Sequence, residues 1–299
     1  MLTGVNVVLA GGDARQLEVI RRLTELDATV TIIGFDRLDT PFPGVTKAEW
    51  TEEALRNADA LVLPPVGTED DGTISAIFTD KELKLTEAFI GNLPPACRIY
   101  CGMAKGYLKK LCASHQLGLV ELFERDDVAI YNSIPTAEGA LMMAIQHTDI
   151  TIHGSNCMVL GLGRTGLTMA RTLQALGARV KTGVRRAETY ARAFEMGFEP
   201  FYMADLARQA GNIDLLFNTI PNMIVTAQVI AGLPLRAVII DLASKPGGTD
   251  FRFAEKRGIK AMLAPGLPGI VAPKTAGRII ANGLIQMLLE DQRLRGNEP

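Results

Sequence analysis

One pattern, which occurs twice, constrains the fold of this chain most. The stretch "VVLAGGDARQLEVIRRL" begins at Val7 and the stretch "CMVLGLGRTGLTMARTL" begins at Cys157. In both, an apolar run meets glycines and continues into a segment with apolar residues at helical spacing, which predicts a strand, a tight turn and a helix. This is the layout of a nucleotide-binding loop. Because 299 residues are enough for two domains, we ask which turn holds a nucleotide and what the other turn does.

Predicted strands and helices alternate through the first half of the chain. Strands are expected at Val5–Leu9 and Thr29–Phe35 and in "ALVLPPV", "CRIYCG" and "LVELF". After the helix of the first stretch, further helices are expected in "TEEALRNA", "TDKELKLTEAFIGNL" and "LKKLCASHQL". Such alternation predicts a doubly wound parallel sheet. We interpret residues 1–134 as a flavodoxin-like domain on the substrate side.

The second half repeats the alternation more clearly. Strands are expected at Met158–Leu160, Arg179–Val184, Leu215–Asn218, Val238–Leu242 and Ile259–Leu263, with helices between them. A helix from Pro135 to about Thr148 is the expected connector, because proline suits a first helical turn. A final amphipathic helix, residues 276–296, is expected to pack back on the first domain. The predicted fold class is α/β, with two doubly wound parallel-sheet domains joined by long helices.

Composition excludes several classes of protein. The charged fraction is 21%, the hydrophobic fraction is 47% and the net charge is −2, without a Lys/Arg-rich tract, so we expect no nucleic-acid and no membrane partner. No apolar run approaches the ~18 residues of a membrane span. We expect buried thiols and no metal site at the four cysteines, and a cytoplasmic, reduced protein: Cys97, Cys101, Cys112 and Cys157.

The second glycine turn has the G-x-G-x-x-G spacing. Gly161 permits a tight turn, Gly163 lets the backbone approach a pyrophosphate, and Gly166 lets helix and strand pack closely. The helix then presents its amino end to the phosphates, so we count Arg164 and Thr165 among the cofactor-binding residues. Because a predicted strand precedes the turn and a helix follows it, residues 135–275 are interpreted as a Rossmann dinucleotide-binding domain. The alternative is a glycine-rich turn without a ligand.

The end of the next strand bears on which dinucleotide binds. An NAD site usually places an acid about 20 residues after the glycines, yet the first acid here is Glu188. Arg185 and Arg186 occupy the strand exit instead, and arginine suits a 2′-phosphate. We therefore predict NADP, with NAD as the alternative; two solvated arginines are the other interpretation.

"LFNTIPNMI" ends a later strand of the same domain. Asn218, Thr219 and Pro221 should lie at the carboxyl edge of the sheet, where open α/β folds bind ligands. We expect them to border the nicotinamide ribose. A plain proline turn is the alternative.

The first glycine turn lacks the third glycine. Asp13 at the start of the helix would cap it and would repel a phosphate. Arg15 would instead suit a carboxylate, which arginine binds bidentately, and we group Gln16 with it. The alternative is a capped helix with a surface arginine.

Further polar residues are expected near strand ends, and hence at a cleft between the domains. Each alone is more simply a solvated loop residue, so their repeated placement is the evidence. We assign a substrate-binding role to Lys105, Ser133 and Thr136, and a catalytic role to Glu138, Lys245 and Lys274. The sequence shows no recognisable Ser–His–Asp catalytic triad.

Five segments together resemble one family over essentially the whole chain. They are "GGDARQLEVIRRL", "NSIPTAEGALMMAIQHTDITIHG", "VLGLGRTGLTMARTLQALGARVKTGVRR", "NTIPNMI" and "LAPGLPGIVAPKTAGRIIANG". This combination resembles the bacterial dipicolinate synthase A-subunit family. The glycine fingerprint is generic, whereas "GGDARQ", "IPTAEGA" and "PGLPGIVAPKTAG" are more specific. More distantly, the second half looks like the cofactor domains of 2-hydroxyacid dehydrogenases, S-adenosylhomocysteine hydrolase and shikimate dehydrogenase.

The resemblance implies an activity, partners and a setting. The family makes pyridine-2,6-dicarboxylate (dipicolinate) during sporulation, in a branch from the lysine pathway, so the mother cell of a sporulating bacterium is the implied location. The implied reaction is NADP-dependent oxidation of dihydrodipicolinate, which derives from 4-hydroxy-tetrahydrodipicolinate. The flavoprotein-like B-subunit of dipicolinate synthase is the implied partner, and we expect an oligomer.

In this setting the cationic residues would hold the carboxylates of a small cyclic dicarboxylate. Arg15, Lys105, Lys245 and Lys274 are the candidates. Placement alone suggests Glu138 or Asp13 as the general base. Two alternatives remain: an NADP-dependent oxidoreductase of another small carboxylic acid, of the 2-hydroxyacid or shikimate type, or a non-catalytic NADP-binding partner protein.

Overall fold

The chain divides into two compact units. The computed structural model describes residues 1–39 and 42–296, with side chains up to Arg293. Unit 1 comprises Met1–Ala129 and the chain from Ala272 onward, and unit 2 comprises Ile130–Val271. The division expected from the sequence, after residues 134 and 275, lies close to these positions. Both units are α/β, as predicted.

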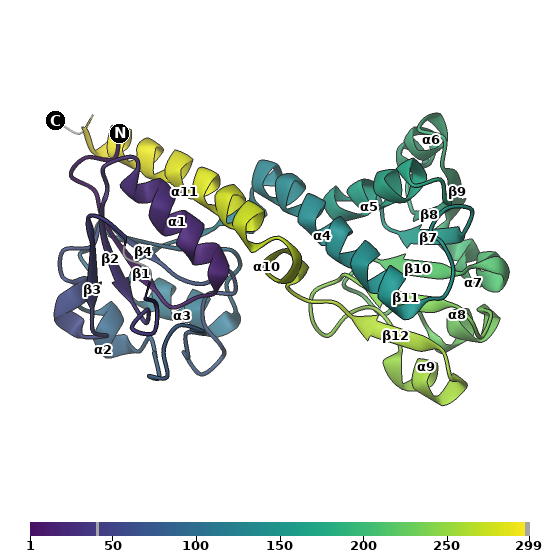
Figure 1. Cartoon of the computed structure of the whole chain (residues 1–299), viewed down its shortest axis with the longest axis horizontal. Helices are drawn as coiled ribbons and strands as arrows, with labels where there is room; N and C mark the ends of the chain where they lie inside the picture. The colour runs from purple at the N-terminus through teal and green to yellow at the C-terminus, as the bar shows by residue number, and fades with distance from the viewer. Residues whose placement is uncertain (40–41, 297–299) are drawn as a thin grey trace. The chain divides into compact units, whose positions relative to one another are not determined.

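Unit 1 is built on one parallel sheet of six strands in the order β3-β2-β1-β4-β5-β6. Figure 1 labels the first four strands of the chain, β1 to β4. Its strands are β1 Asn6–Ala10, β2 Thr29–Ile33, β3 Val45–Ala48, β4 Ala60–Val62, β5 Arg98–Cys101 and β6 Gly118–Glu121. Its helices are α1 Ala14–Thr24, α2 Glu87–Ile90, α3 Gly106–Ser114 and α11 Pro273–Gly296, with short 3-10 helices at Glu52–Leu55 and Leu122–Glu124.

Unit 2 contains a second parallel sheet of six strands in the order β12-β11-β10-β7-β8-β9. Its strands are β7 Asn156–Leu160, β8 Arg179–Val184, β9 Glu199–Tyr202, β10 Leu215–Asn218, β11 Val238–Asp241 and β12 Lys260–Leu263. The helix α4, Asp126–His147, leads into it. The others are α5 Arg164–Ala175, α6 Ala187–Glu195, α7 Leu206–Gln209, α8 Ala227–Gly232, α9 Phe251–Arg257 and α10 Leu267–Val271, with 3-10 turns at Met203–Asp205 and Ala210–Asn212.

The two sheets share one topology. Numbered within its own unit, each sheet has the strand order 3-2-1-4-5-6, which is that of a dinucleotide-binding fold. A flavodoxin-like sheet has five strands in the order 2-1-3-4-5. The description of the first domain as flavodoxin-like is therefore wrong in strand order, and unit 1 has the same fold as the predicted cofactor domain.

Each sheet buries an apolar core on both faces. In unit 1, Val7 and Leu9 of β1 pack under α1 and α11, whereas Val8 and Ala10 pack under α2 and α3. In unit 2, α4, α5 and α6 cover one face, and α7, α8 and α9 cover the other. Side chains of consecutive strand residues point to opposite faces, so continuous apolar runs such as "VVLA" suit a sheet that is covered on both sides.

Two edge strands and one helix depart from the sequence-based expectation. The strands β3 and β9 are short and polar, and both lie at a sheet edge, where the apolar signal is weakest. The helix expected over "TDKELKLTEAFIGNL" is wrong apart from α2. Leu83 and Leu85 are buried with Lys84 between them, and Ile74 N–H donates to Leu83 O, so this stretch is extended.

The connector helix begins earlier than expected. The structure starts α4 at Asp126, which places Pro135 inside the helix and not in its first turn. Proline lacks an N–H and disturbs a helix interior, which is why the sequence favoured a boundary there.

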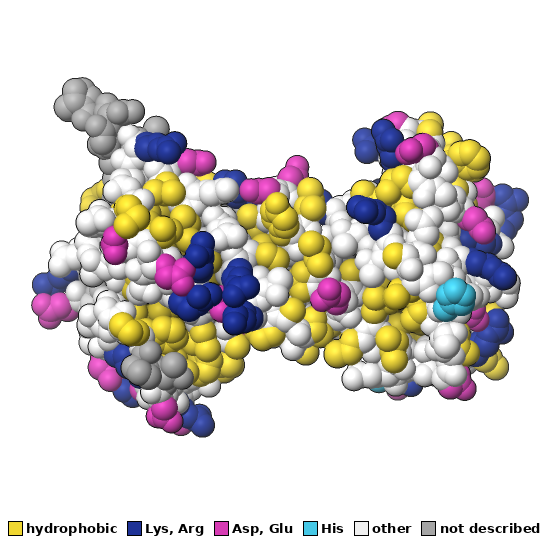
Figure 2. Space-filling model, turned by 45° about the horizontal axis from the view of Figure 1, so that its top comes forward, with side chains coloured by type: hydrophobic (Ala, Val, Ile, Leu, Met, Phe, Trp, Pro, Cys, Tyr) yellow, Lys and Arg dark blue, Asp and Glu magenta, His cyan; other side chains and the backbone are white. Residues whose placement is uncertain are grey.

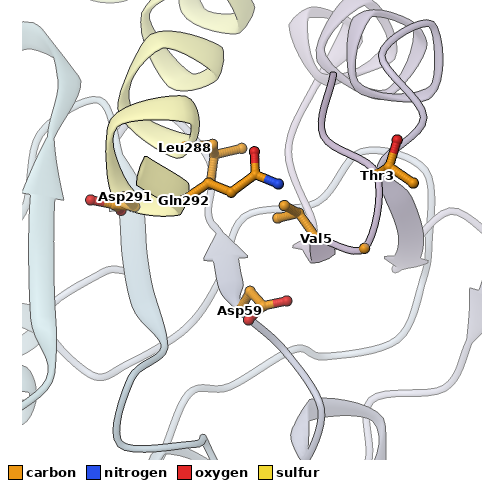
Figure 3. Close-up of a pocket in the computed structure, with 7 residues that line it drawn as sticks. Thr3, Val5, Asp59, Leu288, Asp291 and Gln292 are labelled. Atoms are coloured by element: carbon orange, nitrogen blue, oxygen red, sulfur yellow. The ribbon is translucent and has the colours of Figure 1, made fainter. Parts of the chain in front are cut away.

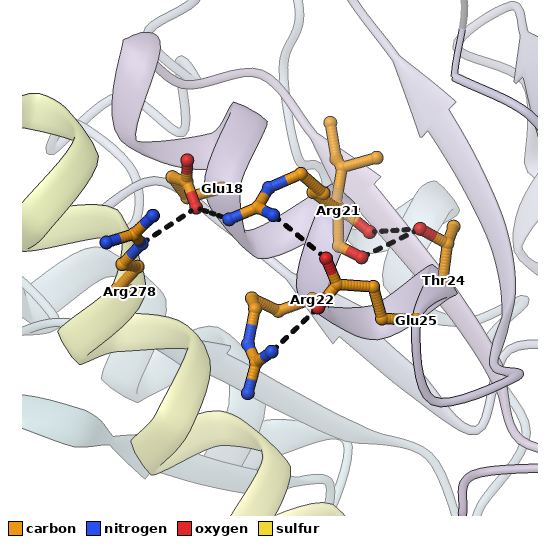
Figure 4. Close-up of polar contacts among 7 residues, drawn as sticks. Glu18, Arg21, Arg22, Thr24, Glu25 and Arg278 are labelled. Carbon is orange, nitrogen blue, oxygen red and sulfur yellow. Dashed lines mark hydrogen bonds and ion pairs between the residues drawn. The ribbon is translucent and has the colours of Figure 1, made fainter.

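The final helix packs on the first helix of unit 1. Glu18 of α1 accepts hydrogen bonds from Arg21 Nη2 at 2.5 Å and from Arg278 Nε of α11 at 3.4 Å (Figure 4). Close approach is possible because a Cβ at Gly277 would lie 2.4 Å from the carbonyl oxygen of Arg15. The carboxyl-terminal helix thus completes the core of the amino-terminal unit.

Candidate functional site

The glycine turn between β7 and α5 is open to a ligand. Gly161 has a φ of +88°, and its N–H donates to Gly183 O at 3.0 Å, which fixes the turn against β8. A Cβ at Gly166 would lie 1.9 Å from Gly161 O, so helix and strand meet at glycine as predicted. A Cβ at Gly163 would meet nothing within 4 Å. Open space therefore lies over the residue at which a pyrophosphate would approach the backbone.

The two corresponding helices begin differently. Helix α5 has Gly163 as its N-cap residue and no side-chain cap, whereas α1 has Asp13, whose carboxylate accepts a hydrogen bond from Arg15 N–H. An uncapped helix start offers backbone N–H groups to an anion, and an aspartate cap repels one. The geometry at each turn is that expected of a phosphate site in unit 2 and of a poor one in unit 1.

A cavity of about 280 Å³ adjoins the open turn. Arg185 and Arg186 line it at the exit of β8, and both are exposed. Arg186 Nε lies 3.1 Å from Glu188 Oε1, while Arg185 has no ion-pair partner among the described residues. The remaining lining residues are Gly161, Leu162, Gly163, Gly183, Val184, Thr189, Met203 and Ile220. This arrangement places permanent positive charge beside the glycine turn.

Six of these lining residues were missed from the sequence: Leu162, Gly183, Val184, Thr189, Met203 and Ile220. Gly183 carried a signal, because a glycine inside a strand marks a close approach, here of Met203, whose Sδ would lie 2.7 Å from a Cβ. Thr189 lies on α6, Met203 begins a 3-10 turn and Ile220 follows β10, so only the tertiary structure brings these three together.

The residues after β10 act mainly on the chain itself. Asn218 is fully buried; its Nδ2 donates to Ile220 O and to Asp241 Oδ1, and its Oδ1 accepts from Ile220 N–H. Thr219 Oγ1 donates to Leu160 O at 2.8 Å, directly behind the glycine turn. The Asn218 side chain is therefore engaged by bonds within the chain, whereas Pro221 is exposed. That these residues border a nicotinamide ribose stays a prediction.

Asp241 ties the next loop to this turn. Its carboxylate is fully buried and accepts four hydrogen bonds, from Asn218 Nδ2, Ala243 N–H, Gly248 N–H and Thr249 Oγ1. A buried carboxylate with so many donors is a structural clamp. Lys245, on the loop that Asp241 holds, is exposed.

The glycine turn of unit 1 is covered by the chain itself. We call residues 73–78 the covering segment. Gly12 N–H donates to Ser75 O at 2.7 Å, and Gly12 O accepts from Ile77 N–H at 3.0 Å. A Cβ at Gly11 would lie 2.7 Å from Ser75 O. The covering segment thus lies over the glycines, where a dinucleotide would approach them.

The predicted cations of unit 1 already have carboxylate partners. Arg15 Nη2 lies 2.6 Å from Asp13 Oδ2, and Arg15 Nε also donates to Asp13 Oδ1 at 2.9 Å. Lys105 Nζ pairs with Glu69 Oε2. Burial raises the pKa of the Asp13 carboxyl, but the hydrogen bonds and charge of Arg15 together leave that pKa below its ordinary value. Both cations are therefore already paired within the chain, whereas the sequence suggested that they are free to bind a ligand carboxylate.

The remaining predicted residues are divided between the two units. Ser133 is buried in unit 2, where its Oγ donates to Ile130 O and contacts Thr168 Oγ1 at 2.6 Å, so its expected contact with substrate is not supported. Thr136 Oγ1 donates to Asn132 O within the same helix. Glu138 is exposed on α4, and Lys274 is exposed on α11.

A second cavity, of about 190 Å³, lies at the amino-terminal ends of β1 and β4 in unit 1 (Figure 3). It is lined by Thr3, Gly4, Val5, Asp59, Leu288, Asp291 and Gln292. Asp291 Oδ2 accepts from Tyr100 Oη at 2.5 Å, and Asp291 Oδ1 lies 2.6 Å from Arg98 Nη1, so this carboxylate anchors α11. Doubly wound sheets bind ligands at the carboxyl ends of their strands, so this cavity is not our candidate site.

Three further features bear on the expectations from composition: the cysteines, the surface charge and the helices. All four cysteines are buried, and burial raises the pKa of the Cys101 thiol to about 12. Figure 2 shows side chains of both signs interspersed on the face it displays. Within the described residues, no helix combines the length and apolar character that crossing a bilayer requires.

Two family models match the two halves of the chain. The model of the N-terminal domain of the dipicolinate synthase A-subunit matches residues 6–123. The model of the NADPH-binding domain of acetohydroxy acid isomeroreductase matches residues 151–241, which include the open glycine turn and β8.

Relatives match the chain over its whole length. The dipicolinate synthase A-subunit of Bacillus subtilis (strain 168) is 51% identical over 296 residues, covering 99% of this chain and all of that one. The crystal structure of the dipicolinate synthase A-subunit from Bacillus halodurans is 53% identical, with a TM-score of 0.93 and full coverage of both chains. A transhydrogenase from Sinorhizobium meliloti shares the fold, with a TM-score of 0.69 at 16% identity over 94% of this chain and 93% of that one.

Proposed function

Because this chain belongs to the dipicolinate synthase A-subunit family, we propose that it oxidises dihydrodipicolinate to pyridine-2,6-dicarboxylate with NADP. The observation that carries the proposal is the open, uncapped glycine turn of unit 2 beside an arginine-lined cavity. A doubly wound sheet with this turn is built to bind a dinucleotide. The family relationship supplies the substrate, and unit 2 supplies the cofactor site.

The cofactor preference rests on the exit of β8. Arg185 and Arg186 line the cavity where an NAD-binding domain usually has an acid. The one nearby acid, Glu188, is paired with Arg186. NADP is therefore the proposed cofactor, since guanidinium groups bind a 2′-phosphate and an unpaired acid would repel it. A match to an NADPH-binding domain model over residues 151–241 supports this choice.

The reaction removes two electrons and two protons from the ring. Bound NADP would supply the acceptor for a hydride from a ring carbon, and a proton would leave the ring for a base or for water. The chain orients the reactants: Gly161–Gly166 fixes the pyrophosphate end, and the Asn218–Asp241 clamp holds the neighbouring loops. Asp13 is the weaker of the two candidate bases, because its pairing with Arg15 lowers its pKa; Glu138 is exposed and remains the other.

The proposal extends to partners and setting. The names of the relatives designate one lettered component of a synthase, so we propose a second, flavoprotein-like component as partner and an oligomeric assembly. We also propose a role in sporulation, in the cytoplasm of the mother cell.

Reconstitution tests the reaction. The chain, alone and with a candidate partner protein, is mixed with freshly generated substrate and NADP, and the absorbances of NADPH and of dipicolinate are followed. We expect both to rise together, in equal amounts. NADPH binding without turnover in either preparation would contradict catalysis and would favour a cofactor-binding role alone. Turnover of another small carboxylic acid alone would contradict the substrate.

Gly163→Asp tests the cofactor site. An aspartate here should cap α5, as Asp13 caps α1, and so leave the fold intact, since a Cβ at Gly163 has open space. We expect an unchanged or higher melting temperature together with a loss of NADPH binding, because the carboxylate repels the pyrophosphate. Gly211→Asp, at another glycine with open space, is the control. Unchanged NADPH affinity in Gly163→Asp would place the cofactor elsewhere.

A further inference from the structure

The sheet of unit 1 has a topological switch point, at which the strand order reverses. Strand β1 lies between β2 and β4, and the chain crosses from one side of β1 to the other before β4, so the switch point lies between β1 and β4. The covering segment lies over the β1 glycines through its hydrogen bonds to Gly12. Doubly wound folds bind ligands at the carboxyl ends of the strands that flank such a point.

Two side chains at this point are buried with an unpartnered oxygen. Gln16 is 1% exposed; its Nε2 donates to Leu63 O at 3.2 Å, which assigns Oε1 as the free acceptor. Its side chain also packs against Gly12, so the amide lies between the ends of β1 and β4. Thr68, on the loop after β4, is fully buried, and its Oγ1 has no partner among the described residues. Such orphaned polar atoms are costly unless a ligand or water satisfies them.

The two residues with unpartnered oxygens, Gln16 and Thr68, are each adjacent in the sequence to a residue of an ion pair. Gln16 follows Arg15, which holds Asp13, and Thr68 precedes Glu69, which holds Lys105. The Arg15 side chain is 13% exposed and that of Lys105 is 37% exposed. The strands that precede the two cations, β1 and β5, are separated only by β4, which is about 10 Å at ordinary strand spacing. Long Arg and Lys side chains reach across such a gap from both sides.

We propose that the substrate binds unit 1 by exchange: its two carboxylates replace Asp13 on Arg15 and Glu69 on Lys105, while Gln16 Oε1 and Thr68 Oγ1 bond the polar edge of its ring. Thr68 Oγ1 donates to the ring nitrogen, whereas Gln16 Oε1 accepts only from a ligand that carries a donor, such as the hydroxyl of 4-hydroxy-tetrahydrodipicolinate. A ligand with two carboxylates pairs with both cations, whereas a monocarboxylate pairs with only one, so the site selects the dicarboxylate. Asp13 and Glu69 are the internal competitors that the ligand must displace.

Binding of pyridine-2,6-dicarboxylate to the full chain, measured by calorimetry without cofactor, tests the exchange. Asp13→Asn keeps an oxygen for the cap of α1, and Glu69→Gln lies on a loop, so both variants should fold. Each removes one internal competitor, and we expect each to bind the dicarboxylate about three- to tenfold more tightly. Asp70→Asn makes the same charge change next to Glu69 and should bind like the wild type. Unchanged or weaker binding by both test variants would overturn the exchange.

Thr68→Val gives a second, independent readout. Removing an orphaned buried hydroxyl should leave the melting temperature of the free chain unchanged or higher, and should weaken dicarboxylate binding by about tenfold. A lower melting temperature with unchanged affinity would show that Thr68 serves the fold alone. Pyridine-2-carboxylate should bind the wild type more weakly than the dicarboxylate, and equal affinities would contradict the selection.

This inference rests on the proposed function, and the two fail separately. If the wild type turns over dihydrodipicolinate but Asp13→Asn and Glu69→Gln leave the affinity unchanged, only the exchange is wrong. If these variants bind the dicarboxylate more tightly but no NADPH forms with any partner protein, only the proposed reaction is wrong.

Discussion

The residue at the start of one helix distinguishes the glycine turns of the two units, which share the same fold. Both units have the strand order 3-2-1-4-5-6 and a glycine turn after their first strand. At the helix start, Asp13 in unit 1 is a carboxylate and Gly163 in unit 2 is bare backbone. Because a helix amino end attracts anions best when its N–H groups are not capped by an acid, we expect this one position to favour a phosphate in unit 2 and to disfavour one in unit 1.

Arg185 and Arg186 together should set the cofactor preference. We expect the double change Arg185→Ser, Arg186→Ser to raise the Kd for NADPH about 10- to 100-fold, which corresponds to a loss of about 1.4–2.8 kcal/mol for the two exposed arginines together. The Kd for NADH should change little, and fluorescence titration measures both. Arg192→Ser on α6, an exposed arginine paired with Glu195, is the control. Equal losses for the two cofactors would contradict a 2′-phosphate contact.

At the level of elements, the crossing of α1 and α11 depends on Gly277. A Cβ there would lie 2.4 Å from the Arg15 carbonyl oxygen, which is backbone and cannot rotate away. We expect Gly277→Ala to lower the free energy of unfolding by about 1–3 kcal/mol, as overpacking does. Urea denaturation measures this loss. Gly106→Ala, where a Cβ meets nothing within 4 Å, should be tolerated, and an equal effect at both sites would argue against the crossing.

The same crossing gives unit 1 a dependence on pH. Burial raises the pKa of the Glu18 carboxyl, and Arg21 and Arg278 together bring it below its ordinary value of 4.5. Because the pKa of Glu18 is lower in the folded state, its ionised carboxylate stabilises the fold fully at pH values above 4.5. This stabilisation is lost as the pH falls through the pKa of the folded state. We expect Glu18→Gln to cost about 1 kcal/mol at pH 7 and progressively less below pH ~4.5. Urea denaturation over a pH series would contradict this if the difference stayed constant.

For the whole chain, two independently cored units should respond differently to the cofactor. Each unit buries its own two-sided core, and only unit 2 has the open glycine turn. Saturating NADPH stabilises what it binds, by about 2.7 kcal/mol at 100 times its Kd. We expect hydrogen exchange to slow in residues 161–166 and 183–189 and to stay unchanged at 11–16. Protection at 11–16 of equal size would show that unit 1 also binds the nucleotide.

Local patterns were enough to predict the architecture. Apolar runs followed by glycine and helical spacing predicted the first strand of each unit, and Arg179–Val184 and Leu215–Asn218 match β8 and β10. These elements are central and buried on both faces, so their apolar signal is strong. The edge strands β3 and β9 were missed because edges are short and polar. The stretch 79–85 was wrongly expected to be helical: its only apolar residues, Leu83 and Leu85, are two apart, as in a strand.

By itself the sequence determined two doubly wound α/β units, an open G-x-G-x-x-G turn in the second and a capped turn in the first, because strand, turn and cap preferences are local. Only the tertiary structure decided the rest. It showed that Asn218 is engaged by the chain, that the covering segment lies over Gly12, and that Arg15 and Lys105 already hold carboxylates. The Lys105 partner is far away in the sequence and the Arg15 partner is two residues away, but in both cases hydrogen-bond geometry and burial, which no spacing encodes, decide whether a charge is free for a ligand.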